Sequence, residues 1–112
     1  MKEERRRFWD RFADIVVDDL ASEDRPEYRA RRRKMLDDLL DRRLRGNSIL
    51  EVGCGPGGNL AAIEAFDPKV IAGCDCSREM LARATNRTHA KLVQSEETAL
   101  PFPDRRFDLV FT

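Results

Sequence analysis

The chain has 112 residues, and its 21 Lys and Arg residues balance its 21 Asp and Glu residues. This length allows one domain, and 41% hydrophobic residues are enough to exclude a wholly disordered chain. The zero net charge excludes the strongly basic composition of ordinary nucleic-acid-binding domains, so we expect no nucleic-acid partner.

The first residues are charged and lack the apolar segment of a secretory signal peptide. No apolar run approaches the roughly 18 residues that a membrane span requires. The three cysteines, Cys54, Cys74 and Cys76, are too few and odd in number for a disulfide framework. The sequence therefore favours a reduced, cytoplasmic protein without membrane attachment.

Residues 1–47 are predicted to form two amphipathic helices that make an N-terminal helical cap. The first has an apolar face at three- and four-residue spacing: Phe8, Trp9, Phe12, Val16 and Leu20. The second begins near Pro26 and ends at Gly46, a residue typical of helix C-terminal caps. Its basic run, Arg29 and residues 31–34, is followed by acids at i+4 spacing, which favours a solvated helix face over a phosphate-binding patch.

Residues 48–112 change to an alternation of strands and helices. Strands are predicted over 48–52, 70–74, 91–94 and 107–111, and helices over 60–66 and 78–86. Such alternation implies βαβ crossovers, so we expect an α/β domain with a parallel sheet covered on both faces.

A glycine cluster follows the first of these strands and is the most informative segment. Gly53, Gly55 and Gly58 fit the pattern G-x-G-x-x-G, in which backbone approaches a ligand closely at a helix N-terminus. Asp75 follows the second strand, about 20 residues after Gly53, where a carboxylate accepts hydrogen bonds from ribose hydroxyls. The alternatives are a glycine turn without ligand, and for Asp75 a helix N-terminal acid ahead of Ser77.

Three segments in order resemble motifs of the class I S-adenosylmethionine-dependent methyltransferases, particularly their small-molecule (type 11) subgroup. They are Ile49-Leu-Glu-Val-Gly-Cys-Gly-Pro-Gly-Gly58, Asp75-Cys-Ser-Arg-Glu-Met-Leu81 and Leu100-Pro-Phe-Pro-Asp-Arg-Arg-Phe-Asp-Leu-Val110. The resemblance implies a Rossmann-like sheet of order 3-2-1-4, S-adenosylmethionine as cofactor, and methyl transfer to a small-molecule acceptor. The family sheet has seven strands, so residues 48–112 are expected to be the cofactor-binding half of a longer domain.

The resemblance also assigns site residues. Glu51, Gly53, Gly55 and Gly57 would surround the methionine end of the cofactor, and Asp75 would hold the ribose hydroxyls. Further along the chain, the adenine would lie against the following residues: Cys76, Met80, Glu96 and Glu97. Glu96 stands where the family usually has Asp and Glu97 where a small residue is usual. No catalytic base is assigned.

Three alternatives stay open. A nicotinamide dinucleotide would bring its diphosphate against Glu51 with like charge, which disfavours it. A zinc site from Cys54, Cys74, Cys76 and His89 lacks the usual C-x₂-C spacing, so we expect no metal. In the third alternative, the chain is a non-catalytic fragment or half-module. Its fourth strand is then an open apolar edge, which favours self-association or pairing with a partner chain.

Overall fold

The computed structural model describes most of the chain, and its described residues are 3–7, 10, 26–39, 41–96, 99–103 and 105–112. Residues 3–7 form a short helical segment. The further helices are α2 (Pro26–Leu39), α3 (Asp41–Leu44), α4 (Gly58–Ile63) and α5 (Arg78–Thr85), with a 3₁₀ turn, η1, at Glu64–Phe66. The strands are β1 (Ser48–Val52), β2 (Val70–Asp75), β3 (Lys91–Gln94) and β4 (Leu109–Phe111).

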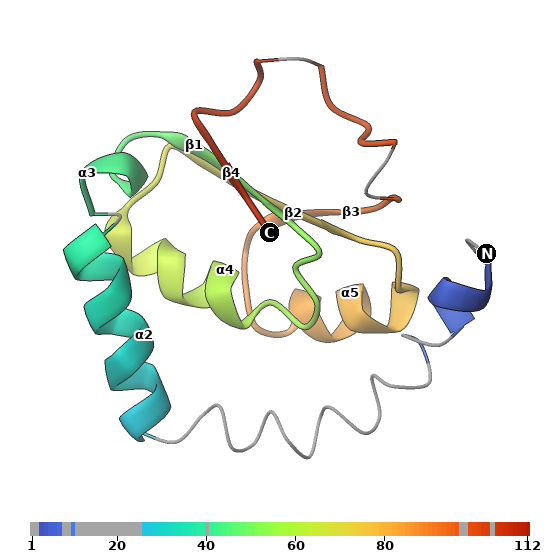
Figure 1. Cartoon of the computed structure of the whole chain (residues 1–112), viewed down its shortest axis with the longest axis horizontal. Coiled ribbons are helices and arrows are strands. Elements are labelled where there is room, and N and C mark those ends of the chain that lie inside the picture. Colours follow the sequence, from blue (N-terminus) through green and yellow to red (C-terminus); the bar gives the residue numbers. More distant parts are fainter. Residues whose placement is uncertain (1–2, 8–9, 11–25, 40, 97–98, 104) are drawn as a thin grey trace.

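The strands form a parallel sheet of order β3-β2-β1-β4, which confirms the predicted α/β fold. The chain moves from β1 to β2 to β3 in one direction across the sheet. Right-handed crossovers then place α4 and α5 on the same face, and Figure 1 shows both helices along one side of the strands.

Alternation along β1 divides the core into two layers. Ile49 packs on the helix side with Leu44, Ile63 and Phe66. Leu50 faces the opposite side, with Val52, Ala72 and Cys74, and the segment after β3 covers this cluster with Phe102 and Phe107. Because successive strand side chains point to opposite faces, Glu51 points to the helix side, as Ile49 does. Its neighbours along the strand, Leu50 and Val52, are buried on the opposite side.

Four predicted elements in this part of the chain need correction at their ends, two of them by one residue: β2 extends to Asp75 and α5 ends at Thr85. The helix expected over 60–66 begins two residues earlier, at Gly58, and its last turn tightens into η1. It ends there because Asp67 takes a left-handed conformation (φ 59°) and precedes Pro68, a position that disfavours continued helix. The strand expected over 107–111 is shorter, because Phe107 leaves the ladder to stack edge-to-face on Phe102, with ring centroids 5.1 Å apart.

The N-terminal prediction is tested only in part. The second predicted helix is divided between α2 and α3, and Gly46 at the end of α3 has the left-handed backbone of a helix cap (φ 72°). Arg33 on α2 lies over the Phe66 ring, 4.9 Å from its centroid, and pairs with Asp37 at 3.4 Å. The apolar face expected over Phe8 to Leu20 lies outside the described residues.

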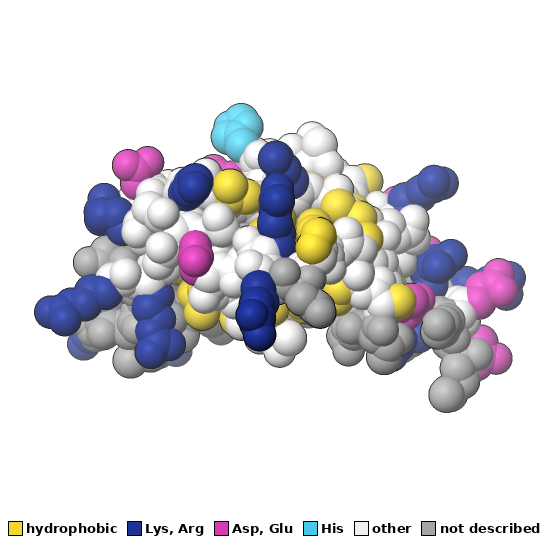
Figure 2. Space-filling model, turned by 90° about the horizontal axis from the view of Figure 1, so that it is seen from above, with side chains coloured by type: hydrophobic (Ala, Val, Ile, Leu, Met, Phe, Trp, Pro, Cys, Tyr) yellow, Lys and Arg dark blue, Asp and Glu magenta, His cyan; other side chains and the backbone are white. Residues whose placement is uncertain are grey.

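β4 forms one edge of the sheet in the described part of the chain. It pairs with β1, and its first contact is reciprocal: the Asp108 amide donates to the Ser48 carbonyl, and the Ser48 amide donates to the Asp108 carboxylate, both at 2.8 Å. Val110 on β4 is 51% exposed. Figure 2 shows hydrophobic side chains reaching the surface on the upper side of the molecule, among Lys and Arg side chains.

Candidate functional site at the carboxyl ends of the strands

The described site residues lie at the carboxyl ends of β1 and β2, in the loops that follow β1, β2 and β3, and, for Met80, on the first turn of α5. In a parallel sheet these loops meet at one edge, where ligands of doubly wound folds bind. The loop after β1 turns back at once, because the amides of Gly53 and Cys54 both donate to the Cys74 carbonyl of the neighbouring strand, at 2.8 and 3.0 Å. The loop is therefore pinned to β2 before α4 begins.

Positive φ angles explain why this loop needs glycine. Gly53, Gly55 and Gly57 have φ of 73°, 53° and 86°, a backbone region that L side chains rarely adopt. A Cβ at Gly55 would meet no heavy atom within 4 Å, so open space lies above the loop there. A Cβ at Gly57 would lie 3.0 Å from the Ala84 Cβ, so at that position glycine also permits close packing on α5.

Asp75 links the glycine loop to α5. One carboxylate oxygen accepts the Gly55 amide at 2.8 Å, and the other accepts the Ser77 amide at 2.9 Å. The second contact matches the alternative interpretation of Asp75 as an acid before a helix, and the first shows that the same carboxylate also orders the loop. A carboxylate has about four acceptor positions, so two remain for a hydroxyl-bearing ligand.

Glu51 is a buried carboxylate beneath the loop, 4% exposed. Its Oε2 accepts a hydrogen bond of 2.9 Å from the Asn59 side chain, on the first turn of α4. Asn59 was not among the predicted site residues, since a polar residue eight positions along the chain carries no recognisable spacing signal. The pair fixes the Glu51 side chain at the end of β1.

The electrostatics of the site favour a cationic ligand. The pKa of the Cys54 thiol rises from 9.0 to about 12, because burial disfavours the thiolate and because Asp75, Glu51 and Cys74 add negative potential. The carboxylates of Asp75 and Glu51 therefore both lie close enough to the Cys54 thiol to raise its pKa. A diphosphate would be repelled there, whereas an ammonium or sulfonium group would be attracted.

The residues predicted at the adenine end lie around the start of α5. Cys76 is half-buried and Met80 is buried, and the Gln94 side chain donates to the Cys76 carbonyl at 3.0 Å. Glu96 follows β3, its side chain is 11% exposed, and it forms an ion pair with Arg5 at 2.7 Å. Glu97 lies outside the described residues. Sequence patterns gave no sign of the Arg5 contact.

Within the described ranges, no three His, Cys, Asp or Glu side chains gather as metal ligands. The helices of the described part include none long and apolar enough to cross a membrane. A separate cavity of about 600 Å³ lies between α2 and α4. Of the residues singled out from the sequence for ligand binding, it is lined by Gly58 alone, together with Arg29, Ala30, Arg33, Ala61, Ala62, Ala65 and Arg87.

Comparison with known families identifies the fold that carries this site. A family model described as a methyltransferase domain matches residues 49–112, more than half of the chain. The chain belongs to this family. The match covers the glycine loop, Asp75 and the segment through β4, and it decides against the nicotinamide-binding alternative for this methyltransferase domain.

Individual relatives agree with the family assignment. The methyltransferase domain is 36% identical, over 69 residues, to a fatty-acid O-methyltransferase of Mycolicibacterium smegmatis; the match covers 58% of this chain and 25% of the relative. Among solved structures, DesVI of Streptomyces venezuelae is 28% identical with a TM-score of 0.65, covering 88% of this chain and 42% of that one. An S-adenosylmethionine-dependent methyltransferase from Mesorhizobium loti is 27% identical with a TM-score of 0.58, covering 79% and 39%. The chain thus spans less than half the length of each of these proteins.

Proposed function

We propose that this chain binds S-adenosylmethionine and is the cofactor-binding part of a methyltransferase that acts on a small organic acceptor. The observation that carries the proposal is the Asp75 carboxylate at the end of β2, tied to the Gly55 amide at 2.8 Å and placed with Glu51 around the same loop. The family membership and the named cofactor of the Mesorhizobium loti relative support this choice.

The residues present fit this cofactor. The remaining acceptor positions of Asp75 suit the two ribose hydroxyls, and the open space above Gly55 allows backbone to approach the ligand. The buried Glu51 carboxylate supplies negative potential for the ammonium group of the methionine end. When bound, the cofactor supplies an activated methyl group on a cationic sulfur, with a neutral leaving group.

Catalysis at such a site rests on positioning. The loop pinned to β2 and the Asn59 hydrogen bond hold the acids in fixed places, so little reorganisation is needed when the cofactor binds. A general base is required only where the acceptor arrives protonated. The acceptor class is proposed from the relatives: the Mycolicibacterium smegmatis protein is named for methylation of fatty acids.

Calorimetric titration with S-adenosylhomocysteine tests the proposal. Asp75→Ala removes the ribose acceptor and is expected to abolish measurable binding. Asp37→Ala is the matched control, because Asp37 is an exposed aspartate on α2 whose side chain pairs with Arg33. Thermal melts of both variants establish that each is folded. Absence of heat with the wild-type protein, or an unchanged Kd in Asp75→Ala, would contradict the proposal.

The β4 edge favours a second candidate function, a non-catalytic module completed by a strand from another chain. Val110 is half exposed on a strand that pairs with β1 on one side, and exposed apolar edges are templates for strand pairing. Sedimentation velocity at rising concentration tests this candidate. Association is expected to disappear in Val110→Lys, since charged edge residues oppose pairing; a monomer at every concentration would exclude it.

A further inference from the structure

The cavity between α2 and α4 has a basic side and a small apolar side. Its guanidinium groups come from α2 and from the turn after α5: Arg29, Arg33 and Arg87. Its apolar side is one face of α4 that continues into η1. Among the described residues that line it, none is acidic. The volume of about 600 Å³ lies in the range of pockets that hold small organic molecules.

Small residues on α4 explain why this space is open. Glycine and alanine recur at spacings of three and four along α4 and η1, which places them on one face: Gly58, Ala61, Ala62 and Ala65. The other face of α4 carries Leu60 and Ile63, which are fully buried in the core. Figure 1 shows α2 beside α4. Because a methyl group is the largest side chain on the face toward α2, the space between the two helices is not filled.

Arg33 is held in place at the edge of this cavity. Its Nε lies 3.4 Å from Asp37 Oδ1, and its guanidinium lies over the Phe66 ring, 4.9 Å from the centroid. The contact with Asp37 engages Nε, so the donors of the two terminal nitrogens are available to an oxyanion. A guanidinium that is already positioned loses less conformational freedom when such a ligand binds.

Three guanidinium groups around one cavity favour an anionic ligand. Glu64, the acid within the α4–η1 stretch, is not among the lining residues; its Oε1 accepts hydrogen bonds from the Thr88 hydroxyl and from the His89 amide, the latter at 2.6 Å. Guanidinium groups bind carboxylates and phosphates through parallel hydrogen bonds. The alanine methyl groups offer an apolar surface to the rest of the ligand.

We propose that this cavity binds a small organic anion, with its carboxylate or phosphate group at the arginines and its apolar part against the alanine face of α4. The site is separate from the acids proposed to hold the cofactor, and it does not depend on the proposed function. Carboxylate and phosphate ligands share the chemistry of an oxyanion, and titration with one probe of each kind distinguishes them.

Amide chemical shifts, followed by NMR during titration, test the site with three probes of similar size: phenyl phosphate, benzoate and benzyl alcohol. We expect at least one of the two anions to shift the amide signals of Ala61, Ala62 and Ala65, and the neutral alcohol to leave them unchanged. The anion that binds more tightly identifies the head group. No shift with either anion, or equal affinity for benzyl alcohol, overturns the proposal.

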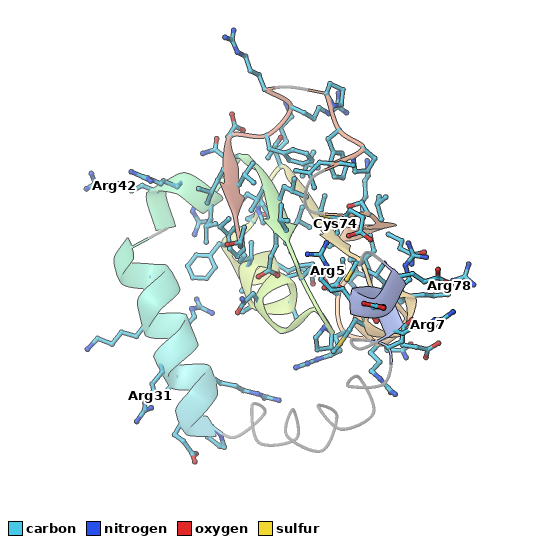
Figure 3. All side chains as sticks on the ribbon, turned by 45° about the vertical axis from the view of Figure 1, so that its right-hand side comes forward. Arg5, Arg7, Arg31, Arg42, Cys74 and Arg78 are labelled. Atoms are coloured by element: carbon cyan, nitrogen blue, oxygen red, sulfur yellow. The ribbon has the colours of Figure 1, made fainter. Side chains whose placement is uncertain are left out.

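Arg29→Gln and Arg87→Gln test the arginines against a matched control, Arg31→Gln. Arg31 is an exposed residue of α2 that does not line the cavity, and in Figure 3 it projects from α2 away from the sheet. We expect each of the first two variants to raise the Kd of the anion about three- to tenfold, and Arg31→Gln to change it by less than about twofold.

Thermal melts establish that each variant is folded, and the comparison of the three probes on the wild type stands without the variants. Added salt is expected to weaken binding of the anion, because it screens the charges on both partners. A Kd raised as much by Arg31→Gln as by Arg29→Gln would show attraction to the basic surface in general and would overturn the proposed site.

Discussion

Gly73 on β2 is the position where adding one methyl group tests the packing beneath the glycine loop. A Cβ there would lie 2.6 Å from the Leu60 Cδ1 and 3.0 Å from both the Cβ and the Sγ of Cys54. Leu60 is fully buried and Cys54 is 6% exposed, so neither side chain has solvent to move into. Gly73→Ala is therefore an overpacking substitution.

The expected cost follows from these contacts. Gly73 has no positive φ, so alanine meets no backbone strain and would by itself gain about 0.4–1 kcal/mol from the unfolded chain. Overpacking of a close-packed core costs about 1–3 kcal/mol. We expect Gly73→Ala to lower the free energy of unfolding, measured by urea titration, and to weaken S-adenosylhomocysteine binding because Cys54 belongs to the loop.

A double-mutant cycle isolates the contact. Leu60→Val removes both δ carbons, Cδ1 included, and leaves a β-branched side chain that is shorter by one carbon, at a cost of about 1 kcal/mol for the buried methylene. It is expected to relieve part of the clash in the double variant. The two changes should then cost less together than their sum, by about 1 kcal/mol, with the Cys54 contact still unrelieved. Additive costs, or a Gly73→Ala variant as stable as the wild type, would refute this account of the packing.

The remaining predictions concern one ionisation and two hydrogen bonds. The free energy of unfolding should fall by about 1 kcal/mol between pH 8 and pH 10, because the Cys54 thiol ionises near 9 when unfolded but near 12 when folded. Ser77→Ala should cost about 1 kcal/mol in urea titration, since the Ser77 hydroxyl accepts the Met80 amide at 3.1 Å as the cap of α5. Asp108→Ala should cost about 0.5–1 kcal/mol by the same assay, because it removes the exposed 2.8 Å hydrogen bond from the Ser48 amide at the start of β1.

The pH prediction and the Ser77→Ala prediction each have a control variant. The sign of the pH effect follows because the unfolded chain releases the thiol proton first, so rising pH favours unfolding; Cys54→Ala should remove that part of the slope, and an unchanged slope would contradict it. Thr85→Ala is a matched control for Ser77, since its hydroxyl donates to the Leu81 carbonyl on the exposed end of the same helix. A Ser77→Ala loss no larger than that of Thr85→Ala would refute the capping role.

The parts of the fold that sequence predicted are those set by local patterns. The short run Ser48–Val52 predicted β1 with its observed bounds, because a buried parallel strand needs a continuous apolar segment. β3 also has its predicted bounds, Lys91–Gln94, although its two end residues are exposed. The glycine loop and Asp75 were also predictable, since positive φ and a carboxylate at the end of β2 leave clear signals in residue type.

The parts that it missed depend on tertiary contacts. The bond between Asn59 and Glu51 arises because the loop folds α4 back over β1. The pair between Arg5 and Glu96 joins residues 91 positions apart, and no periodicity marks it. Similarly, Phe107 fits a strand pattern, but packing on Phe102 removes it from the ladder. Long-range packing therefore decides which of the predicted site residues are accessible.

The central claim is that the carboxyl ends of β1 and β2 bind the adenosyl group of the cofactor. A crystal structure of the protein with S-adenosylhomocysteine tests it most directly. The account predicts ribose hydroxyls within hydrogen-bonding distance of Asp75 and the methionine end beside Glu51 and the Gly53–Gly57 loop. Density for the ligand in the arginine-lined cavity between α2 and α4, or ribose hydroxyls bound away from Asp75, would contradict it.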